Sequence, residues 1–187
     1  MKIVLVRHGE SEGNVQHIIS DDPQRIVNLT ERGRAQAEAA SSKLREMRFT
    51  HAYASQFTRA QQTAAILLRH HELELNIDAR LNERISGMDG LPVNLFNDLI
   101  SPDPLHLKSE KGETFLEQME RVRSFLDEVA IRHADGLVLA VSHENPIVAA
   151  LALTVDEPET VVRRNIDNCG WIELDWPIKK DITRMSF

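Results

Sequence analysis

Cysteine is almost absent from this sequence, and so are long apolar runs. Cys169 is the single cysteine, so no disulfide can form within the chain, which favours a reducing compartment. The apolar run that begins at Met1 is too short for a signal peptide, and no stretch approaches the roughly 20 apolar residues that a membrane span needs. We therefore expect a cytoplasmic protein that is not held in a membrane.

An excess of positive charge is also lacking. The chain has 22 Lys and Arg against 29 Asp and Glu, a formal net charge of −7. Nucleic acids and anionic membranes reward clustered Lys and Arg, so we expect neither as a partner. The 8 histidines show no H-E-x-x-H or paired-cysteine pattern, so no metal is expected. The sequence offers no repeat, low-complexity segment or linker, which predicts one domain over residues 1–187.

Hydrophobic periodicity predicts strands that alternate with helices. Such alternation favours a mainly parallel sheet covered on both faces, a three-layer αβα sandwich of the α/β class. The strands are expected near 2–7, 52–54, 75–78, 137–141 and 168–174, and the helices at Thr30 to Met47, 57–69, Glu113 to His133, from Pro146 onward, and near 156–164.

Two segments depart from this alternation. Residues 84–112 contain several glycines and prolines, which predict an irregular, lid-like insertion. The tail after Pro177 is expected to form an edge strand or an extension. By contrast, the helix from Glu113 carries apolar residues at spacings of four and three, which is typical of a core-facing stripe.

Arginine and histidine follow the first apolar strand directly, in Arg7-His8-Gly9-Glu10. A second strand, Leu137 to Val141, delivers Ser142-His143 in the same way. Because ligands of open α/β sheets collect at the carboxyl ends of strands, the two histidines could converge on one site. Such a short motif is weak evidence alone, since a histidine at a strand end can also be a hydrogen-bonded core residue.

Two further blocks strengthen this interpretation. Ser55 is followed by Arg59-Ala60 and by Gln62-Thr63, and Leu81-Asn82-Glu83-Arg84 comes next along the chain. With the Leu29-Thr30 and Gly33 helix start, these blocks occur in the order typical of the histidine phosphatase superfamily, of the branch 1, phosphoglycerate-mutase-like type. The chain resembles this family from residue 1 to about residue 175.

The resemblance implies a phosphohistidine mechanism without cofactor, in which His8 is the nucleophile and Glu83 the general acid. The residue types suit this chemistry. A neutral imidazole can offer one lone pair to phosphorus, and the planar fork of arginine binds two phosphate oxygens at once. We expect Arg7, Arg59 and His143 to stabilise the charge on the phosphoryl oxygens.

Two of the assignments, Glu83 and Asn14, have plain alternatives. From spacing alone, Glu83 would be an exposed carboxylate paired with Arg80 or Arg84, and only the family block favours the acid. Asn14 is expected to donate to a phosphate oxygen, or else to be a turn residue beside Gly13. Asn145 is a further candidate for substrate binding.

Two departures from the family pattern concern the same pocket. Glu144 stands where most members have glycine, and its charge would weaken phosphate binding. Asn145 followed by Pro146 predicts a helix that starts there, with Glu144 before the cap and directed away. The Gly87-Met88-Asp89-Gly90 segment is shorter than its family counterpart, which puts the reach of Glu83 in question.

Three functions remain open for this sequence. We favour a phosphatase that passes the phosphoryl group from His8 to water, over a phosphoglycerate-type mutase and over a non-catalytic protein that binds phosphorylated ligands. The substrate is expected to be a small phosphorylated molecule, recognised by residues 9–29 and 84–112. Arg25, Arg84 and Lys108 either contact a second anionic group of the substrate or are ordinary surface residues. A homodimer is the oligomer to be considered.

Overall fold

A five-stranded sheet forms the centre of the computed structural model, which describes residues 1–177. The strand order is β3-β2-β4-β1-β5, in which the first four strands run parallel and β5 is antiparallel to β1. The strands are β1 (Lys2–Arg7), β2 (His51–Ala54), β3 (Leu75–Ile77), β4 (Leu137–Ser142) and β5 (Trp171–Asp175). The strands lie within one residue of their predicted ends, except that β5 begins three residues later than predicted, at Trp171. The tail after Pro177 falls outside the described residues.

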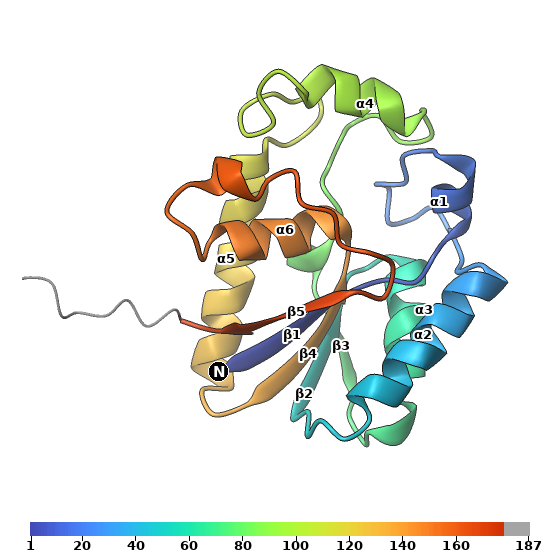
Figure 1. Ribbon diagram of the computed structural model, residues 1–187, viewed down its shortest axis with the longest axis vertical. Helices are drawn as coiled ribbons and strands as arrows, with labels where there is room; N and C mark the ends of the chain where they lie inside the picture. The colour runs from blue at the N-terminus through green and yellow to red at the C-terminus, as the bar shows by residue number, and fades with distance from the viewer. Residues whose placement is uncertain (178–187) are drawn as a thin grey trace, which may run out of the picture.

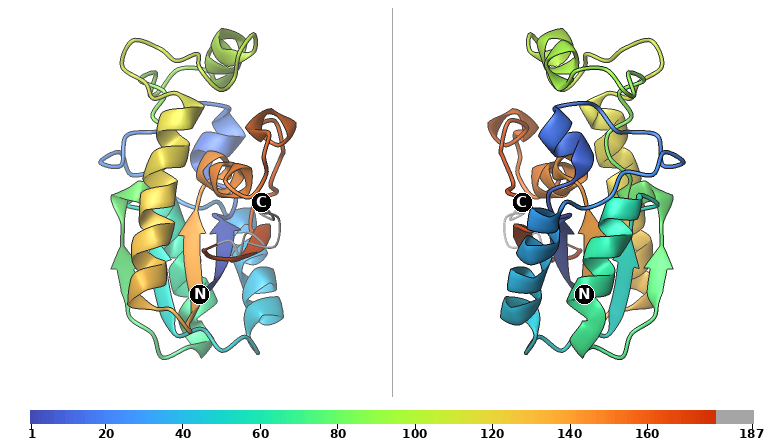
Figure 2. Two further views of the ribbon diagram at one scale, coloured as in Figure 1. Left: turned by 90° about the vertical axis from the view of Figure 1, so that its left-hand side faces the viewer. Right: turned by 90° about the vertical axis from the view of Figure 1, so that its right-hand side faces the viewer.

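Helices cover both faces of the sheet, which confirms the three-layer α/β architecture (Figures 1 and 2). One face carries α2 (Glu31–Leu44) and α3 (Thr58–Leu67), and the other carries α5 (Phe115–Arg132) and α6 (Glu144–Ala152). Figure 1 also shows α4 (Val93–Ile100) above the carboxyl ends of the strands, with α1 (Glu12–Gln16) beside it.

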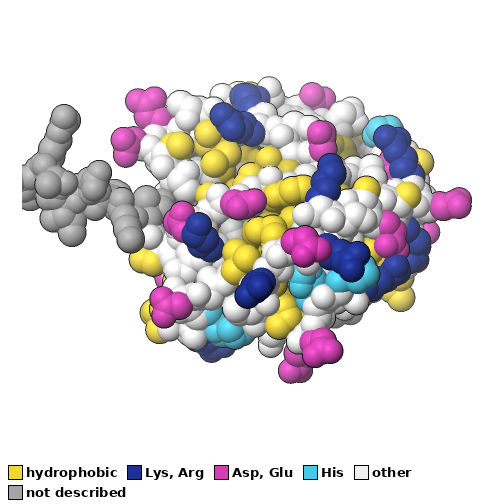
Figure 3. All heavy atoms as spheres, turned by 60° about the horizontal axis from the view of Figure 1, so that its bottom comes forward, with side chains coloured by type: hydrophobic (Ala, Val, Ile, Leu, Met, Phe, Trp, Pro, Cys, Tyr) yellow, Lys and Arg dark blue, Asp and Glu magenta, His cyan; other side chains and the backbone are white. Residues whose placement is uncertain are grey.

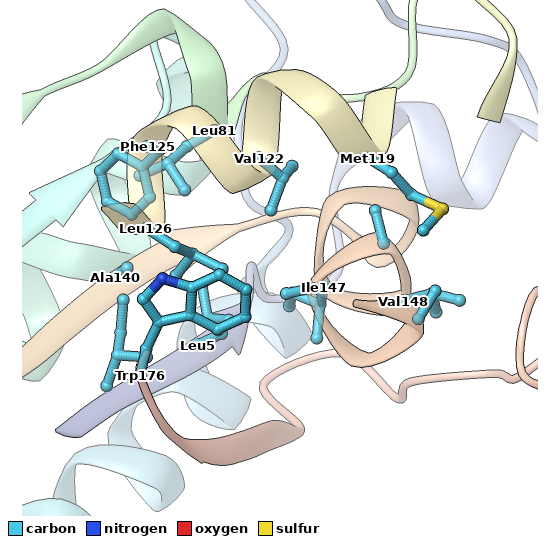
Figure 4. Packing of buried hydrophobic residues seen from close by; sticks show 14 of the residues in the cluster. Leu5, Leu81, Met119, Val122, Phe125, Leu126, Ala140, Ile147, Val148 and Trp176 are labelled. Atoms are coloured by element: carbon cyan, nitrogen blue, oxygen red, sulfur yellow. The ribbon is translucent and has the colours of Figure 1, made fainter. Parts of the chain in front are cut away.

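The core beneath α5 and α6 is built from the stripe that the sequence predicts. Met119, Val122 and Leu126 of α5 are buried, and they pack with Leu5 of β1 and Ile147 of α6 (Figure 4). Burying side chains of this kind stabilises a fold by roughly 1.5–3 kcal/mol each. This packing holds α6, whose first residues reach the site described below, against the central strands.

Side chains that cap helices set the ends of α2 and α5. The hydroxyl of Thr30 accepts a hydrogen bond from the Gly33 amide at 2.9 Å, as the sequence predicts. Thr114 and Glu117 form a capping box at the start of α5.

Gly9 and Gly33 allow the loop after β1 to lie directly on the start of α2. A Cβ atom on Gly9 would lie 2.4 Å from the Gly33 carbonyl oxygen, and one on Gly33 would lie 2.0 Å from the Glu10 carbonyl oxygen. Any side chain at either position would therefore push the loop that carries His8 away from the helix.

Two local predictions are wrong, and a third segment contains a helix that the sequence did not indicate. The lid segment contains α4, which buries Phe96, although glycine and proline around it suggested irregular structure. The segment 156–164 forms only a 3-10 turn, Pro158–Thr160, because the β-branched pair Val161 and Val162 disfavours continuation and the chain must reverse toward β5. The loop 9–29 contains the short α1, capped by Ser11.

No helix within residues 1–177 has both the length and the apolar character to cross a bilayer. On the face shown in Figure 3, side chains of both charge signs are interspersed.

Candidate active site

A cavity of about 280 Å³ opens where the parallel strands end. The register of β1 and β4 places Arg7 opposite Ser142, and the His8 amide donates to the Ser142 carbonyl at 3.0 Å. The residues after β1 and β4 are therefore neighbours, as the strand-end argument predicts. The cavity lining contains six of the residues nominated from the sequence: Arg7, His8, Asn14, Arg59, Glu83 and Asn145.

The His8 ring has a defined hydrogen-bonding pattern. Its Nδ1 lies 2.7 Å from the Gly9 carbonyl oxygen, and its Nε2 lies 3.1 Å from Nε of Arg59. Because a guanidinium can only donate, Nε2 must accept, and the ring proton resides on Nδ1. Burial and, next, the charge of Arg59 hold the pKa of His8 well below the usual histidine value. His8 is thus a neutral imidazole whose Nε2 lone pair is directed toward Arg59.

Arg59 is buried at the centre of the site. Its Nη1 donates to the Ser20 hydroxyl at 3.0 Å, its Nη2 donates to the Ser20 carbonyl at 2.9 Å, and its guanidinium lies 4.4 Å from the centre of the Phe57 ring. Burial lowers the pKa of Arg59 to about 10, so the side chain is still charged at neutral pH. A buried cation beside a neutral imidazole is suited to an anionic group.

His143 is fully buried behind Arg59 rather than on the cavity wall. Its Nδ1 lies 3.2 Å from Nη2 of Arg59, and its Nε2 lies 2.8 Å from the Ser55 hydroxyl. The same donor argument makes Nδ1 the acceptor, so Nε2 carries the proton and donates to Ser55. Burial and then Arg59 lower its pKa. In this structure His143 is therefore neutral, and it reaches the cavity through two lining residues, Arg59 and His8, whose ring centre lies 5.0 Å from its own.

Glu144 corrects the prediction for the start of α6. The helix begins at Glu144 with His143 at the N-cap, so Asn145 is not the cap and Pro146 is not the first helical residue. One Glu144 oxygen lies 3.2 Å from Nη1 of Arg7, and the other accepts from the Ile166 amide at 3.1 Å. Glu144 therefore faces the cavity and neutralises one of its cations, instead of pointing away.

The Glu83 carboxylate also faces the cavity, although spacing alone favoured a surface ion pair. The neighbouring Arg80 is engaged by Asp78 and Glu128, at 2.6 and 2.8 Å. Arg121 donates to the Glu83 carbonyl at 3.0 Å and so holds the backbone of this loop. The shorter loop that follows does not prevent Glu83 from reaching the cavity that His8 lines.

Burial raises the pKa of the Glu83 carboxyl above its usual value, against the opposing effects of the Arg84 amide and the Arg59 charge. A carboxyl with a raised pKa holds its proton at higher pH and can donate it. The pair of a neutral histidine and a carboxyl with a raised pKa is suited to a nucleophile and a general acid.

The side-chain oxygen of Asn14 is engaged by Ser11. Its Oδ1 accepts from the Ser11 amide at 3.0 Å and from the Ser11 hydroxyl at 3.1 Å. Within residues 1–177, no hydrogen bond occupies its Nδ2, so this group can donate to a ligand. Asn145, in the first turn of α6, also lines the cavity.

Four residues that support this site were not nominated from the sequence. Ser55 and Ser20 hold His143 and Arg59 in place, Thr63 accepts from the Gly9 amide at 3.1 Å, and Asn168 donates to the His8 carbonyl at 3.1 Å. Ser55 and Thr63 belong to the family block around Arg59, so that block could have pointed to them. Ser20 and Asn168 lie in segments that carry no comparable pattern.

Comparisons with known proteins find relatives over most of the chain. A family model described as the histidine phosphatase superfamily (branch 1) matches residues 3–183. A 2,3-bisphosphoglycerate-dependent phosphoglycerate mutase of Thermoplasma acidophilum is 34% identical, over 98% of this chain and 92% of its own length. Phosphoserine phosphatase 1 of Hydrogenobacter thermophilus is 30% identical, over 80% of this chain and 74% of its own length. The crystal structure of an α-ribazole phosphatase from Shigella flexneri superposes with a TM-score of 0.81 at 25% identity, covering 94% of this chain and 90% of its own.

Proposed function

The chain belongs to the histidine phosphatase superfamily (branch 1), and on this basis we propose that its cavity hydrolyses small phosphomonoesters through a phosphohistidine. The observation that carries the proposal is the His8 ring, a neutral imidazole whose Nε2 accepts from a buried arginine at the edge of the cavity. Several relatives bear phosphatase names, which supports a phosphoric monoester hydrolase.

In the first step, the Nε2 lone pair of His8 attacks phosphorus, and the bond to the leaving oxygen breaks. The phosphoryl oxygens take the place of Nε2 as acceptors for the Arg59 guanidinium, and Arg7 and the Asn14 amide donate to them as well. Glu83 gives its proton to the leaving oxygen, which departs as an alcohol. His143 orients Arg59 from behind.

In the second step, the Glu83 carboxylate accepts a proton from water, which attacks the phosphohistidine. The bond between phosphorus and Nε2 breaks, and His8 returns to its neutral form. Phosphate leaves, and Glu83 is again protonated. The same residues thus serve both steps with the direction of proton transfer reversed.

A mutase is the second candidate, because a relative named as a phosphoglycerate mutase is 34% identical to this chain. In that reaction the phosphoryl group would pass from His8 to another hydroxyl instead of to water. Measuring phosphate release and phosphoglycerate interconversion on the same preparation separates the two functions. We expect phosphate release to dominate.

Removal of divalent metal is expected to leave turnover unchanged, because Arg7 and Arg59 supply the positive charge that a metal would provide. The measurement is release of p-nitrophenol from p-nitrophenyl phosphate before and after dialysis against EDTA. Loss of activity that returns with Mg²⁺ or Zn²⁺ would contradict the proposed mechanism.

Glu144→Gln is expected to tighten inhibition by inorganic phosphate or vanadate by about three- to tenfold, because Arg7 loses a competing negative charge. The glutamine oxygen can still accept from the Ile166 amide. Glu12→Gln is the matched control, since the Glu12 carboxylate also accepts from a backbone amide, that of Asn28 at 3.0 Å, but does not line the cavity. Weaker inhibition in Glu144→Gln would mean instead that Glu144 positions Arg7 for the phosphate.

A cytoplasmic location and a homodimer complete the proposal. The location is supported by Cys169, a buried cysteine without a disulfide. Light scattering of the purified protein would decide the oligomeric state.

A further inference from the structure

The cavity lining contains an apolar group of side chains as well as a charged one. The cations and His8 lie where the strands end, whereas most of the apolar side chains come from two other segments. These are Ile18 and Ile19 of the loop after α1, and Val93, Phe96 and Ile100 of α4. The two segments are joined by backbone hydrogen bonds, among them the Ile19 amide to the Leu91 carbonyl at 2.8 Å.

We infer that the alcohol released from the substrate is a small, uncharged apolar group, aliphatic or aromatic, and that a second anionic group on the substrate is selected against. This inference rests on the proposed phosphatase function and specifies its substrate class. It follows from the apolar wall, from the engagement of Arg25, Arg84 and Lys108 by other groups, and from two carboxylates that line the cavity.

Two cations that could have bound a second anion are paired elsewhere. Nη1 of Arg25 lies 2.7 Å from Asp89, and Nζ of Lys108 lies 2.9 Å from Glu117. Neither side chain lines the cavity. Within residues 1–177, its cationic lining consists of Arg7, Arg59 and Arg84, and no lysine contributes to it.

Arg84 lines the cavity, but its guanidinium serves the lid. It is buried and donates to the carbonyls of Leu107, Glu113 and Pro104, at 3.1, 3.3 and 3.4 Å. The guanidinium also lies 5.3 Å from the centre of the Phe96 ring. Turning Arg84 toward a ligand would break these three hydrogen bonds, and the bond to the Glu113 carbonyl is buried, so its loss is costly. Arg84 therefore holds the apolar wall in place and does not bind a second anion.

Negative charge in the cavity lining opposes a second anion further. Glu144 and Asp21 both line it, and the Asp21 carboxylate is held there by the Ser86 hydroxyl at 2.7 Å and the Gly87 amide at 3.1 Å. With a volume of about 280 Å³, the cavity is also at the small end for ligand sites. A phosphoryl group and one compact apolar group are what it can hold.

Three aryl phosphates test the charge selection directly: 4-methylphenyl, 4-carboxyphenyl and 4-carbamoylphenyl phosphate. The carboxylate-bearing phenol lies between the other two in acidity, so leaving-group chemistry alone would give it an intermediate rate. We expect its kcat/KM to be instead the lowest, by at least about tenfold relative to both neutral substrates.

Asn97→Lys should reduce the difference in kcat/KM between the neutral and the carboxylate substrates by about three- to tenfold. Asn97 is an exposed residue of α4 that lines the cavity, so lysine there supplies a cation for the second anionic group. Asn94→Lys is the matched control. It makes the same substitution at an exposed position of the same helix that does not line the cavity, and it should leave the ratio unchanged.

The possible results separate this inference from the function on which it rests. Hydrolysis of all three substrates with the carboxylate fastest, intermediate or equal would overturn the apolar selection and leave the phosphatase intact. An equal change, in both lysine variants, of the ratio of kcat/KM between neutral and carboxylate substrates would show a general effect of surface charge. It would overturn the inference that the leaving group lies against α4. No hydrolysis of any substrate would overturn the phosphatase itself.

Discussion

His8→Ala is expected to reduce kcat/KM by at least about 10⁴-fold, because it removes the nitrogen that forms the bond to phosphorus. Arg59 and Arg7 would still bind the phosphoryl group, but no side chain could accept it. Rapid-quench labelling with a ³²P substrate should show an acid-labile, base-stable phosphate on the wild-type protein and none on the variant.

A matched control and a second variant make this result specific. His70→Ala removes an exposed histidine outside the cavity and should retain full activity. His8→Gln fills more of the buried position than alanine, and circular dichroism and thermal melting would confirm that either variant is folded. Turnover without any labelled intermediate in the wild-type protein would contradict covalent catalysis.

Glu83→Gln is expected to slow the hydrolysis of an alkyl phosphate by about 10²–10⁴-fold, the usual cost of removing a positioned acid. An alkoxide cannot leave readily without a proton, whereas p-nitrophenolate can. The variant should therefore lose far less activity on p-nitrophenyl phosphate. Steady-state kcat/KM on the two substrates measures the difference.

The pH dependence of the alkyl substrate provides a second readout. The rate should fall as pH rises through the pKa of Glu83, which burial raises above its usual value, because the acid then loses its proton. On the acid side the rate should persist below the ordinary histidine range, since the lowered pKa of His8 keeps the nucleophile neutral. In Glu83→Gln the fall at high pH should disappear.

Equal losses on both substrates would contradict the assignment of Glu83 as the acid. Glu144 and Glu10 are the other carboxylates to consider as the general acid. Glu144 lines the cavity, whereas Glu10 accepts a hydrogen bond from the Thr30 hydroxyl at 2.8 Å and does not line it. Glu144 would then be the carboxylate to replace next.

Local sequence was enough to predict the sheet, its covering helices and the positions of Arg7 and His8 at the end of β1. These features depend on neighbouring residues, because hydrophobic periodicity and capping hydrogen bonds act over a few positions along the chain. The start of α6 was placed two residues late, since Asn145-Pro146 resembles a cap whereas backbone geometry begins the helix at Glu144. The helix α4 was hidden by the glycines and prolines around it.

The roles of the long polar side chains depended on the tertiary structure. Glu83 could have paired with Arg80 or Arg84 on spacing alone, but Asp78 and Glu128 engage Arg80, and the lid carbonyls engage Arg84. Contacts between distant segments decide such choices, because a flexible charged side chain has several partners within reach and only the folded chain determines which of them is present. The residues proposed to bind phosphate were therefore nominated from motifs. The apolar wall, and the engagement of Arg84 by backbone carbonyls instead of by a ligand, follow from packing.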